Sequence, residues 1–278
     1  MRRQPKLAHR TTSLPWFAQK SNLALLKVMS KVIGVIPVRL ESTRLPRKAL
    51  RMICRHSMIE WVYRRASAWP GFERLFVATD SDEVAAHCRQ LNIPAEMTSS
   101  AHRSGTERII EVMRRVPAEI YVNIQGDEPM VTAQHIELLM APFRESRETA
   151  ISTLKVPMTR EDAENPNDVK VVTDRRGRAL YFSRSRIPYD RAGQGQVKYY
   201  KHLGLYAYSA RALETFSKLA PSELELAEAL EQLRFLENGI PIVVIETSDD
   251  TVGVDTEEDL KKVEAYFLRA NIMLPDSH

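Results

Sequence analysis

The sequence is short of cysteine and has no long apolar run. Its 278 residues include two cysteines, Cys54 and Cys88, which stand in no metal-binding or redox spacing. We expect buried free thiols rather than a disulfide, as suits a reducing cytosol. No apolar stretch approaches the roughly 20 residues that span a bilayer. These shortages argue against a disulfide scaffold and against a membrane-spanning protein, and they favour a cytoplasmic one.

Acidic residues are missing from the first 30 positions. This stretch carries six Lys or Arg residues, so residues 31–278 have a net charge of −2 although the whole chain has +4. The body therefore has no broad basic field, and we expect no nucleic-acid partner. Residues 1–30 are compatible with a transit peptide, but a translation start at Met29, just before the first expected strand, is the simpler explanation. We expect a disordered or spurious N-terminal extension.

Strand and helix patterns alternate after residue 30. The first expected strands are Val32–Ile36, Leu75–Thr79, Ala95–Met97 and Ile120–Val122. The helices between them are expected at Met58–Ala68, at Ser81–Leu91 and from Ser104 or Thr106 onward. This β-α-β-α order predicts an α/β fold with a mostly parallel sheet flanked by helices on both faces.

The pattern changes at residue 151. Three successive strands, at Ile151–Val156, Val169–Thr173 and Ala179–Phe182, predict a smaller mixed β insert with antiparallel pairing. The remaining strands are expected at Leu203–Tyr208 and Ile242–Ile245, and the remaining helices near 210–219, 223–237 and 256–270.

The segment Asn123–Pro129 contains the most informative acidic residue. It follows an apolar run, so we expect a buried strand that delivers Asp127 to the carboxyl edge of the sheet, where open α/β sheets bind ligands. Asp255 likewise follows a strand and stands at the start of a helix. Two such carboxylates suit one Mg²⁺ ion. Taken singly, a turn residue at 127 and a helix N-cap at 255 are the more common explanations.

A basic loop that begins at Pro37 follows the first expected strand. Four cations lie within ten positions there: Arg39, Arg44, Arg47 and Lys48. Arginine offers bidentate contacts and lysine a point charge, which suits an oligophosphate, although the Gly-x-x-x-x-Gly-Lys pattern of a Walker loop is absent. A solvated basic loop explains the charge about equally well. The position at the carboxyl end of a strand favours phosphate binding.

Three further segments carry polar side chains that suit ligand contacts. A Ser-Gly-Thr turn at 104–106 could offer free helix N–H groups to a base or phosphate, and an ordinary helix cap is the alternative. A basic set in the second half could bind an anionic acceptor such as a sugar acid, or form a surface cluster. Its members are Arg184, Arg186, Lys201 and His202. Residues 231–234 form either a polar binding face or a solvated helix face.

In their order along the chain, these segments resemble the 3-deoxy-manno-octulosonate (KDO) cytidylyltransferase family, also called CMP-KDO synthetases. The resemblance runs from about Val32 to Leu268, and the ordered set of motifs is far more specific than any one of them. The landmarks are Ser42–Pro46 with Lys48, Val77–Asp80, Met97–Thr98, His102 with Ser104–Arg108, Gln125–Pro129, Asn165–Pro166, Phe182–Arg184 with Ile187–Pro188, His202–Gly204, Glu231–Arg234 and Gly253–Thr256.

The resemblance implies an enzyme with a nucleotide-diphospho-sugar-transferase-like, Rossmann-like fold. Such an enzyme transfers CMP from CTP to the anomeric hydroxyl of KDO, giving CMP-KDO and pyrophosphate for lipopolysaccharide biosynthesis, with Mg²⁺ as cofactor. A cytoplasmic homodimer without a membrane partner is implied as well. The expected single domain covers 31–272, with a nucleotide-binding half at 31–150, a sugar-acid-binding and dimerisation half at 151–240, and a return to the core sheet at 241–272.

The resemblance also implies roles for individual residues. The implied nucleotide-binding residues are Pro37, Arg39, Arg44, Lys48, Met97, Ser104 and Gly105. Of these, Arg39, Arg44 and Lys48 would hold the triphosphate, and Met97, Ser104 and Gly105 would line the cytosine pocket. The implied sugar-acid-binding residues are Gln125, Arg184, His202, Glu231 and Gln232, with Arg184 on the sugar carboxylate. The implied metal ligands are Asp127 and Asp255, which form the catalytic set together with Lys48 and Arg39.

The chain departs from the family's pattern in the basic loop. Arg47 and Ala49 stand where the family usually has Gly and Pro, and Leu40 stands where it has Tyr. Without Gly the loop is less permissive, so its geometry or its affinity for CTP could differ. Two alternatives stay open: the same chemistry on 8-amino-KDO or another sugar acid, and a non-catalytic nucleotide-binding homologue.

Overall fold

The computed structural model describes residues 31–40, 44–102, 104–193 and 195–274. The expectation for residues 1–30 lies outside these ranges, as do two residues of the first landmark, Ser42 and Thr43. The described residues belong to one compact unit that begins at Lys31. The subdivisions expected at residues 150 and 240 stay predictions.

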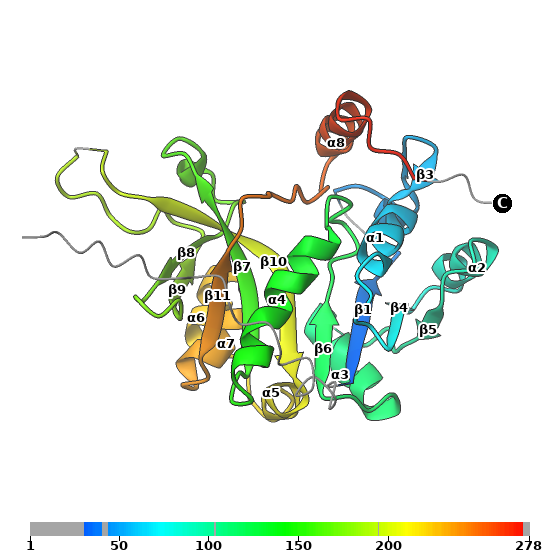
Figure 1. Ribbon diagram of the computed structural model, residues 1–278, viewed down its shortest axis with the longest axis horizontal. Coiled ribbons are helices and arrows are strands. Elements are labelled where there is room, and N and C mark those ends of the chain that lie inside the picture. The colour runs from blue at the N-terminus through cyan, green and yellow to red at the C-terminus, as the bar shows by residue number, and fades with distance from the viewer. Residues whose placement is uncertain (1–30, 41–43, 103, 194, 275–278) are drawn as a thin grey trace, which may run out of the picture. The chain divides into compact units, whose positions relative to one another are not determined.

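A nine-stranded sheet forms the centre of this unit (Figure 1). Its strands are β1 (Val32–Val38), β4 (Arg74–Thr79), β5 (Ala95–Met97), β6 (Ile120–Asn123), β7 (Ile151–Met158), β8 (Lys170–Thr173), β9 (Ala179–Ser183), β10 (Tyr199–Ser209) and β11 (Ile242–Glu246). The order across the sheet is β11-β7-β10-β6-β1-β4-β5, and β8 pairs with β10 and β9. β10 runs antiparallel to β6 and β7, whereas the other neighbours on this path are parallel. The predicted mostly parallel α/β sheet is confirmed.

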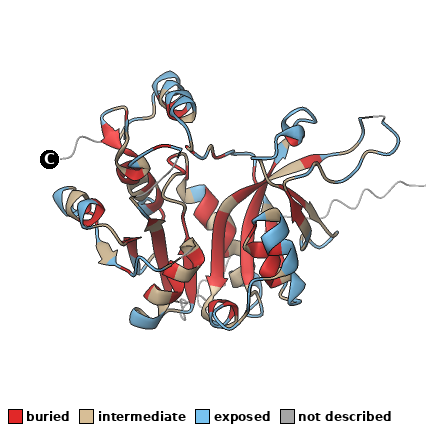
Figure 2. Ribbon diagram, turned by 180° about the vertical axis from the view of Figure 1, so that it is seen from behind, coloured by how far each residue is buried: buried red, intermediate tan, exposed pale blue. Residues whose placement is uncertain are grey.

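Helices cover both faces of the sheet, because each has an apolar stripe that must be buried. On one face, α1 (Met58–Ser67), α2 (Asp82–Gln90) and α4 (Ala133–Glu145) contribute to one hydrophobic cluster. On the other face, α3 (Gly105–Arg115), α5 (Ala210–Phe216) and α7 (Gln232–Glu237) contribute to a second. Figure 2 shows the strands between them as largely buried. The short helix α6 (Glu223–Glu228) precedes α7.

A third cluster attaches the C-terminal helix α8 (Glu257–Arg269) to the first half of the chain. The rings of Trp61 and Phe267 lie 4.3 Å apart, and the Trp61 indole donates to the Ile53 carbonyl at 2.7 Å. Ile53 belongs to a small hairpin of β2 (Met52–Ile53) and β3 (His56–Ser57). The helix begins with a capping box formed by Thr256 and Asp259. Packing at this cluster holds the last helix close to the basic loop.

The structure differs from the expected elements in several places. β7 is not part of a separate insert: it is buried and joins the main sheet between β11 and β10, which leaves β8 and β9 as the antiparallel hairpin. The helix expected at 223–237 is two helices, because Ala229 adopts a left-handed conformation with φ of 53°. The helix α4 was not predicted. Its apolar positions do follow the helical period, but Pro142 within it obscured the pattern.

Two expectations about composition can also be compared with the structure. Both cysteines are free, Cys88 being buried and Cys54 half-buried. Among the helices of the described residues, none has the length and apolarity that crossing a membrane requires.

Candidate active site

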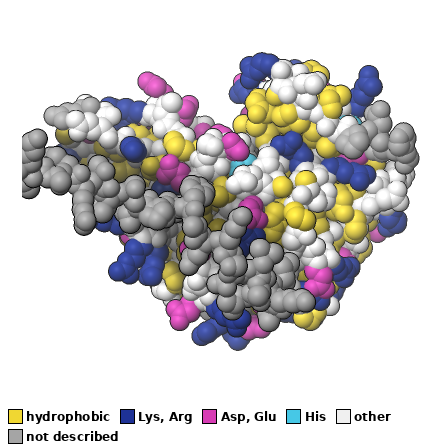
Figure 3. All heavy atoms as spheres, in the orientation of Figure 1, with side chains coloured by type: hydrophobic (Ala, Val, Ile, Leu, Met, Phe, Trp, Pro, Cys, Tyr) yellow, Lys and Arg dark blue, Asp and Glu magenta, His cyan; other side chains and the backbone are white. Residues whose placement is uncertain are grey.

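Two adjoining cavities open at the carboxyl edge of the sheet. The smaller, of about 490 Å³, lies beyond the ends of β1 and β6, and the larger, of about 1120 Å³, reaches toward β7, β10 and α7. They share four lining residues: Arg44, Gly105, Gln125 and Asp255. Figure 3 shows acidic side chains gathered beside a notch in the upper edge of one face. The position at the carboxyl edge agrees with where open α/β sheets bind ligands.

The turn that bears Asp127 packs tightly on the end of β1. A Cβ added to Gly126 would lie 2.6 Å from Val38 Cγ2 and 3.1 Å from the Pro37 carbonyl oxygen, so this position requires glycine. The Glu128 N–H donates to the Gln125 carbonyl at 3.2 Å and closes the turn. Asp127 is thereby fixed relative to the basic loop.

The basic loop bends sharply before a short 3₁₀ helix at Lys48–Leu50. Arg47 adopts the left-handed conformation there, with φ of 56° and ψ of 35°, which costs a non-glycine residue roughly 1–2 kcal/mol. Arg47 thus replaces the family's usual glycine at a position whose left-handed backbone favours glycine. The Arg47 side chain pairs with Glu83 on α2 and lines neither cavity. Arg39, Arg44 and Lys48 do line the smaller cavity.

Asp127 and Asp255 meet at one point, on either side of Lys48. The Lys48 Nζ donates to Asp127 Oδ2 at 2.5 Å and to Asp255 Oδ1 at 2.8 Å. Arg44 Nη2 lies 2.9 Å from the second oxygen of Asp255. A backbone bond from the Val254 N–H to the Asp127 carbonyl, at 2.9 Å, ties the two acidic segments directly. The far-separated carboxylates therefore share one positive charge.

The surroundings keep Lys48 protonated. Burial lowers its pKa, but the charges and hydrogen bonds of Asp127 and Asp255 outweigh that effect, so the net pKa is raised. The ammonium is largely buried, with 17% of the side chain exposed. It is placed to face an anion that enters the smaller cavity.

The two carboxylates fit a Mg²⁺ ion that is bound jointly by protein and substrate. In the described part of the chain no three His, Cys, Asp or Glu side chains cluster as a protein-only metal site would require. Mg²⁺ is usually held by one or two carboxylates, with waters and substrate phosphates completing six ligands. Asp127 and Asp255 already converge on a cation, and their side chains are 33% and 41% exposed, so phosphate and water can reach them.

The nucleotide-side residues gather around the start of α3. Ser104 caps this helix by accepting from the Glu107 N–H, and Gly105 lies against the Pro37 ring. Pro37, Ser104 and Gly105 all line the smaller cavity. Met97, which was expected beside them, lines neither cavity and is 41% exposed.

The residues expected to bind the acceptor divide between the lining of the larger cavity and a position outside it. Gln125, His202, Glu231 and Gln232 line this cavity. Arg184 lines neither cavity, because its guanidinium donates to the carbonyls of Glu228 at 2.8 Å and of Pro166 at 3.2 Å.

Glu231 joins the two sides of the site. Burial raises the pKa of this carboxyl, while hydrogen bonds from Thr106 and Ser104 act in the opposite direction. The start of α7 on the acceptor side is thereby bonded to the start of α3 on the nucleotide side.

His202 is buried as a neutral imidazole. Burial, followed by the charge of Lys201, lowers its pKa to about 3. Its Nε2 lies 3.0 Å from Thr153 Oγ1, and that hydroxyl donates to the Leu205 carbonyl at 2.8 Å. The Thr153 oxygen therefore accepts from Nε2–H, which leaves Nδ1 as the acceptor of the ring. A neutral ring of this kind suits hydrogen bonding to a sugar hydroxyl.

The buried state of His202 predicts a specific pH dependence of stability. The folded-state pKa lies below the unfolded value of 6.5, so protons bind the unfolded chain more strongly and stability falls as the pH drops from about 6.5 toward 3. At about pH 5 the loss is about 2 kcal/mol. His202→Gln should therefore lose less free energy of unfolding than the wild type between about pH 7.5 and about pH 5.

Urea unfolding of both proteins at the two pH values measures this difference. Glu128, whose pKa burial raises to about 7, acts in the opposite direction because its carboxyl takes up its proton more readily in the folded state. That contribution is common to both proteins and cancels in the comparison. Equal losses for wild type and variant would show that His202 is not buried in neutral form.

Several residues of the larger cavity were not singled out from the sequence. Glu128 is buried, and among the described residues its Oε2 has no hydrogen-bond partner; the same holds for Asn123 Oδ1 and the Tyr206 hydroxyl. Unpaired buried polar atoms that line one cavity are typical of a site for a polar ligand. Glu128 follows Asp127 directly and could have been found from that position. Tyr206 gave no signal, because alternate strand positions look alike in sequence.

The fold and these two adjoining sites define a nucleotidyltransferase of the cytidylyltransferase family, whose sequence profile matches residues 33–247. The 3-deoxy-manno-octulosonate cytidylyltransferase of Acidobacterium capsulatum is 53% identical over 237 residues, which are 85% of this chain and 96% of that protein. The enzyme of the same description from Koribacter versatilis is 52% identical, over 87% of this chain and 92% of that protein.

A solved structure of CMP:2-keto-3-deoxy-manno-octonic acid synthetase complexed with CTP matches with a TM-score of 0.84 and 42% identity. The match covers 87% of this chain and 100% of that one. This chain therefore belongs to the 3-deoxy-manno-octulosonate cytidylyltransferase family, as its motifs predicted.

Proposed function

We propose that this protein transfers CMP from CTP to the anomeric 2-hydroxyl of KDO and releases pyrophosphate. The observation that supports this most directly is the meeting of Lys48, Asp127 and Asp255 where the smaller cavity, which basic side chains line, adjoins the larger polar one. The membership of the family and the names of its relatives favour KDO over its 8-amino analogue, and the intact pair of carboxylates argues against a non-catalytic homologue.

In the proposed reaction the 2-hydroxyl oxygen of KDO forms a bond to the α-phosphorus of CTP. The bond from this phosphorus to the β-phosphate oxygen breaks, pyrophosphate leaves with that electron pair, and the hydroxyl proton passes to solvent. Mg²⁺ held by Asp127 and Asp255 would supply charge neutralisation and a lowered pKa for the attacking hydroxyl. Lys48, Arg39 and Arg44 line the smaller cavity, where they would face the charge that builds on the leaving pyrophosphate.

The acceptor would enter the larger cavity in a fixed orientation. Gln125 lies at the junction of the two cavities and donates to the Gly204 carbonyl at 3.2 Å. His202, Glu231 and Gln232 supply neutral or acidic hydrogen-bonding groups around the remaining space. Such groups hold hydroxyls in place and align the attacking oxygen with the α-phosphorus, which lowers the entropic part of the barrier. Ser104 and Gly105 would contact the cytosine, and Met97 and Arg184 would have to move to take their implied roles.

The proposal includes a homodimer in the cytoplasm that serves lipopolysaccharide biosynthesis. Large apolar side chains are exposed in the second half of the chain: Leu180 on β9 is 62% exposed, Tyr189 78% and Leu226 on α6 70%. A dimer interface in this half of the chain would remove this apolar surface from water.

Pyrophosphate release in the presence of CTP, Mg²⁺ and KDO tests the function. We expect release that depends on all three components, with formation of CMP-KDO. Replacement of CTP by UTP, or of KDO by N-acetylneuraminate, provides the matched controls and should reduce the rate strongly. A folded protein that releases no pyrophosphate with KDO, or releases it equally without an acceptor, would contradict the proposal.

A further inference from the structure

Asp255 reaches the site on a segment without helix or strand. This segment, Thr247–Asp255, connects β11 with α8 and is called the strap below. Figure 1 shows it crossing from β11 toward α8 above the sheet. Asp127, by contrast, sits in a turn that packs against β1. The distance between the two carboxylates therefore depends on what holds the strap.

Main-chain contacts hold the two ends of the strap. At its start the Thr247 N–H donates to the Lys155 carbonyl at 2.9 Å, and the Asp249 carbonyl bonds His135 Nε2 on α4 at 3.0 Å. At its end the Val254 N–H donates to the Asp127 carbonyl. Between these ties lie residues 250–253, which line the larger cavity.

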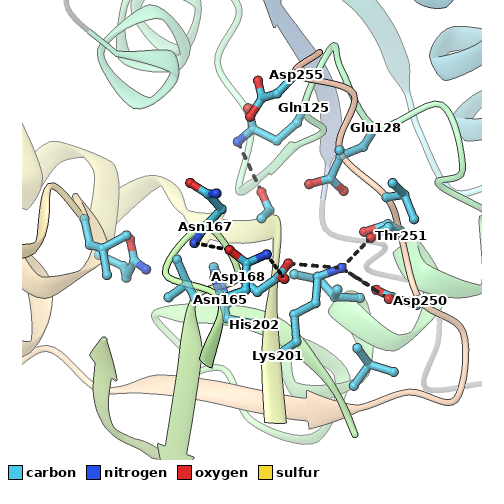
Figure 4. Close-up of a pocket in the computed structure, with 18 of the residues that line it drawn as sticks. Gln125, Glu128, Asn165, Asn167, Asp168, Lys201, His202, Asp250, Thr251 and Asp255 are labelled. Atoms are coloured by element: carbon cyan, nitrogen blue, oxygen red, sulfur yellow. Dashed lines mark hydrogen bonds and ion pairs between the residues drawn. The ribbon is translucent and has the colours of Figure 1, made fainter. Parts of the chain in front are cut away.

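The side chain of Lys201 makes three hydrogen bonds to this middle section. Lys201, on β10, donates from Nζ to Asp250 Oδ1 at 2.9 Å, to Asp250 Oδ2 at 3.2 Å and to the Thr251 carbonyl at 2.9 Å. Figure 4 shows its amino group between these strap residues and Asp168. The Lys201 side chain is 18% exposed and that of Asp250 46% exposed, so water screens the ion pair in part, and the bond to the Thr251 carbonyl is the more sheltered contact.

We propose that Lys201 is a positioning residue: it holds the strap in place and so keeps the Asp255 carboxylate close to the Asp127 carboxylate. Because Lys201 precedes His202 on β10, the same strand carries an acceptor-side residue and the tie to the second carboxylate. The inference rests on the proposed function in that Asp255 acts there as a ligand of the divalent cation.

A direct contact of Lys201 with the acceptor carboxylate is the main alternative, and the structure argues against it. An ammonium group has three N–H donors, and those of Lys201 already face Asp250 and the Thr251 carbonyl. The acids nearby, including Asp168 at 3.9 Å, would also repel an incoming carboxylate. The lysine is therefore engaged with the protein rather than available to a substrate anion.

The test compares Lys201→Met, Asp250→Ala and the double variant. Mn²⁺ binding is measured in the presence of a non-hydrolysable CTP analogue, together with amide hydrogen exchange of the strap. We expect Lys201→Met to weaken Mn²⁺ binding about tenfold, as loss of a residue that orients a ligand does, and to speed exchange at residues 250–255. Asp250→Ala should act in the same direction. The double variant should be no weaker than Lys201→Met, since both changes break one interaction.

Two further variants serve as controls. Lys155→Met removes another buried lysine of this sheet, whose ammonium bonds Thr173 and lies 3.7 Å from Glu246, so Mn²⁺ binding should be unchanged. Lys201→Arg can still pair with Asp250 and should restore most of the affinity.

Two outcomes would overturn the inference. In one, Lys201→Met raises the KM for KDO while Mn²⁺ binding and strap exchange stay at wild-type values, which would assign Lys201 to the acceptor. In the other, Lys201→Met and Asp250→Ala lower only the Tm. If the wild type binds Mn²⁺ with the CTP analogue but transfers no CMP to KDO, the proposed function fails while the role of Lys201 is still decided by the variants.

Discussion

Asp127→Asn should lower turnover by a factor on the order of 10³ or more and leave the fold intact. The change keeps the shape of the side chain and removes the charge that one side of the cation site requires. The main-chain bond from Val254 to the Asp127 carbonyl does not involve the carboxylate, and neither does the packing of Gly126 on β1. The loss should therefore appear in turnover and in Mn²⁺ binding, with Tm and circular dichroism close to wild type.

The matched control for this variant is Asp82→Asn. Asp82 lies exposed in the first turn of α2 and lines neither cavity, so its neutralisation should leave turnover unchanged. Asp255→Asn should repeat the loss expected for Asp127→Asn, because in the proposed reaction the two carboxylates hold the same cation. A well-folded Asp127→Asn protein with near-normal turnover would refute the metal role of this residue.

Lys48→Met should lower turnover by roughly 10²–10³-fold through a different route. It removes the ammonium that lies between the two carboxylates and faces the smaller cavity, but it leaves both carboxylates in place. The negative charge that builds on the leaving pyrophosphate then lacks the Lys48 ammonium, which is already oriented toward it in the wild type. Mn²⁺ binding without nucleotide should not weaken, whereas it should weaken in Asp127→Asn, and this contrast separates the two variants.

Steady-state kinetics decide what Lys48 contributes. A fall in kcat with little change in the KM for CTP indicates an interaction made in the transition state. A rise in KM at constant kcat would show that Lys48 only binds CTP, contrary to the expectation. Lys31→Met is a suitable control, because Lys31 pairs with Glu73 on the surface with 40% of its side chain exposed.

The parts of the site that sequence could predict are those fixed by local chain direction. Asp127 and the basic loop directly follow strands, and parallel strands deliver their following residues to one edge of the sheet. The meeting of Asp127 with Asp255 was predicted as well, but Asp255 lies on the strap beyond the end of β11, so chain direction after a strand does not account for it. Lys48 lies between the two carboxylates, although it is 79 and 207 residues away from them in sequence. This position depends on the tertiary packing of the basic loop, so the sequence pattern could not predict it.

The parts that sequence reasoning did not place depend on side-chain direction and on irregular backbone. Arg184 follows a strand near the acceptor side, yet its long side chain turns to the carbonyls of Glu228 and Pro166. The left-handed conformation of Ala229 split an expected helix without any glycine to mark the break. The strap has neither strand nor helix periodicity, so nothing in its sequence predicted that Lys201 would hold it.

The attachment of α8 through the strap also has a consequence for synthesis of the protein. The sheet from β1 to β11 and the whole smaller cavity except Asp255 are encoded before residue 247. A nascent chain that has emerged only that far can pack both faces of its sheet but holds one carboxylate instead of two. If Asp255 acts as proposed, catalytic competence arrives as a late event, when the closing helix docks on Trp61 and brings its neighbouring aspartate into place.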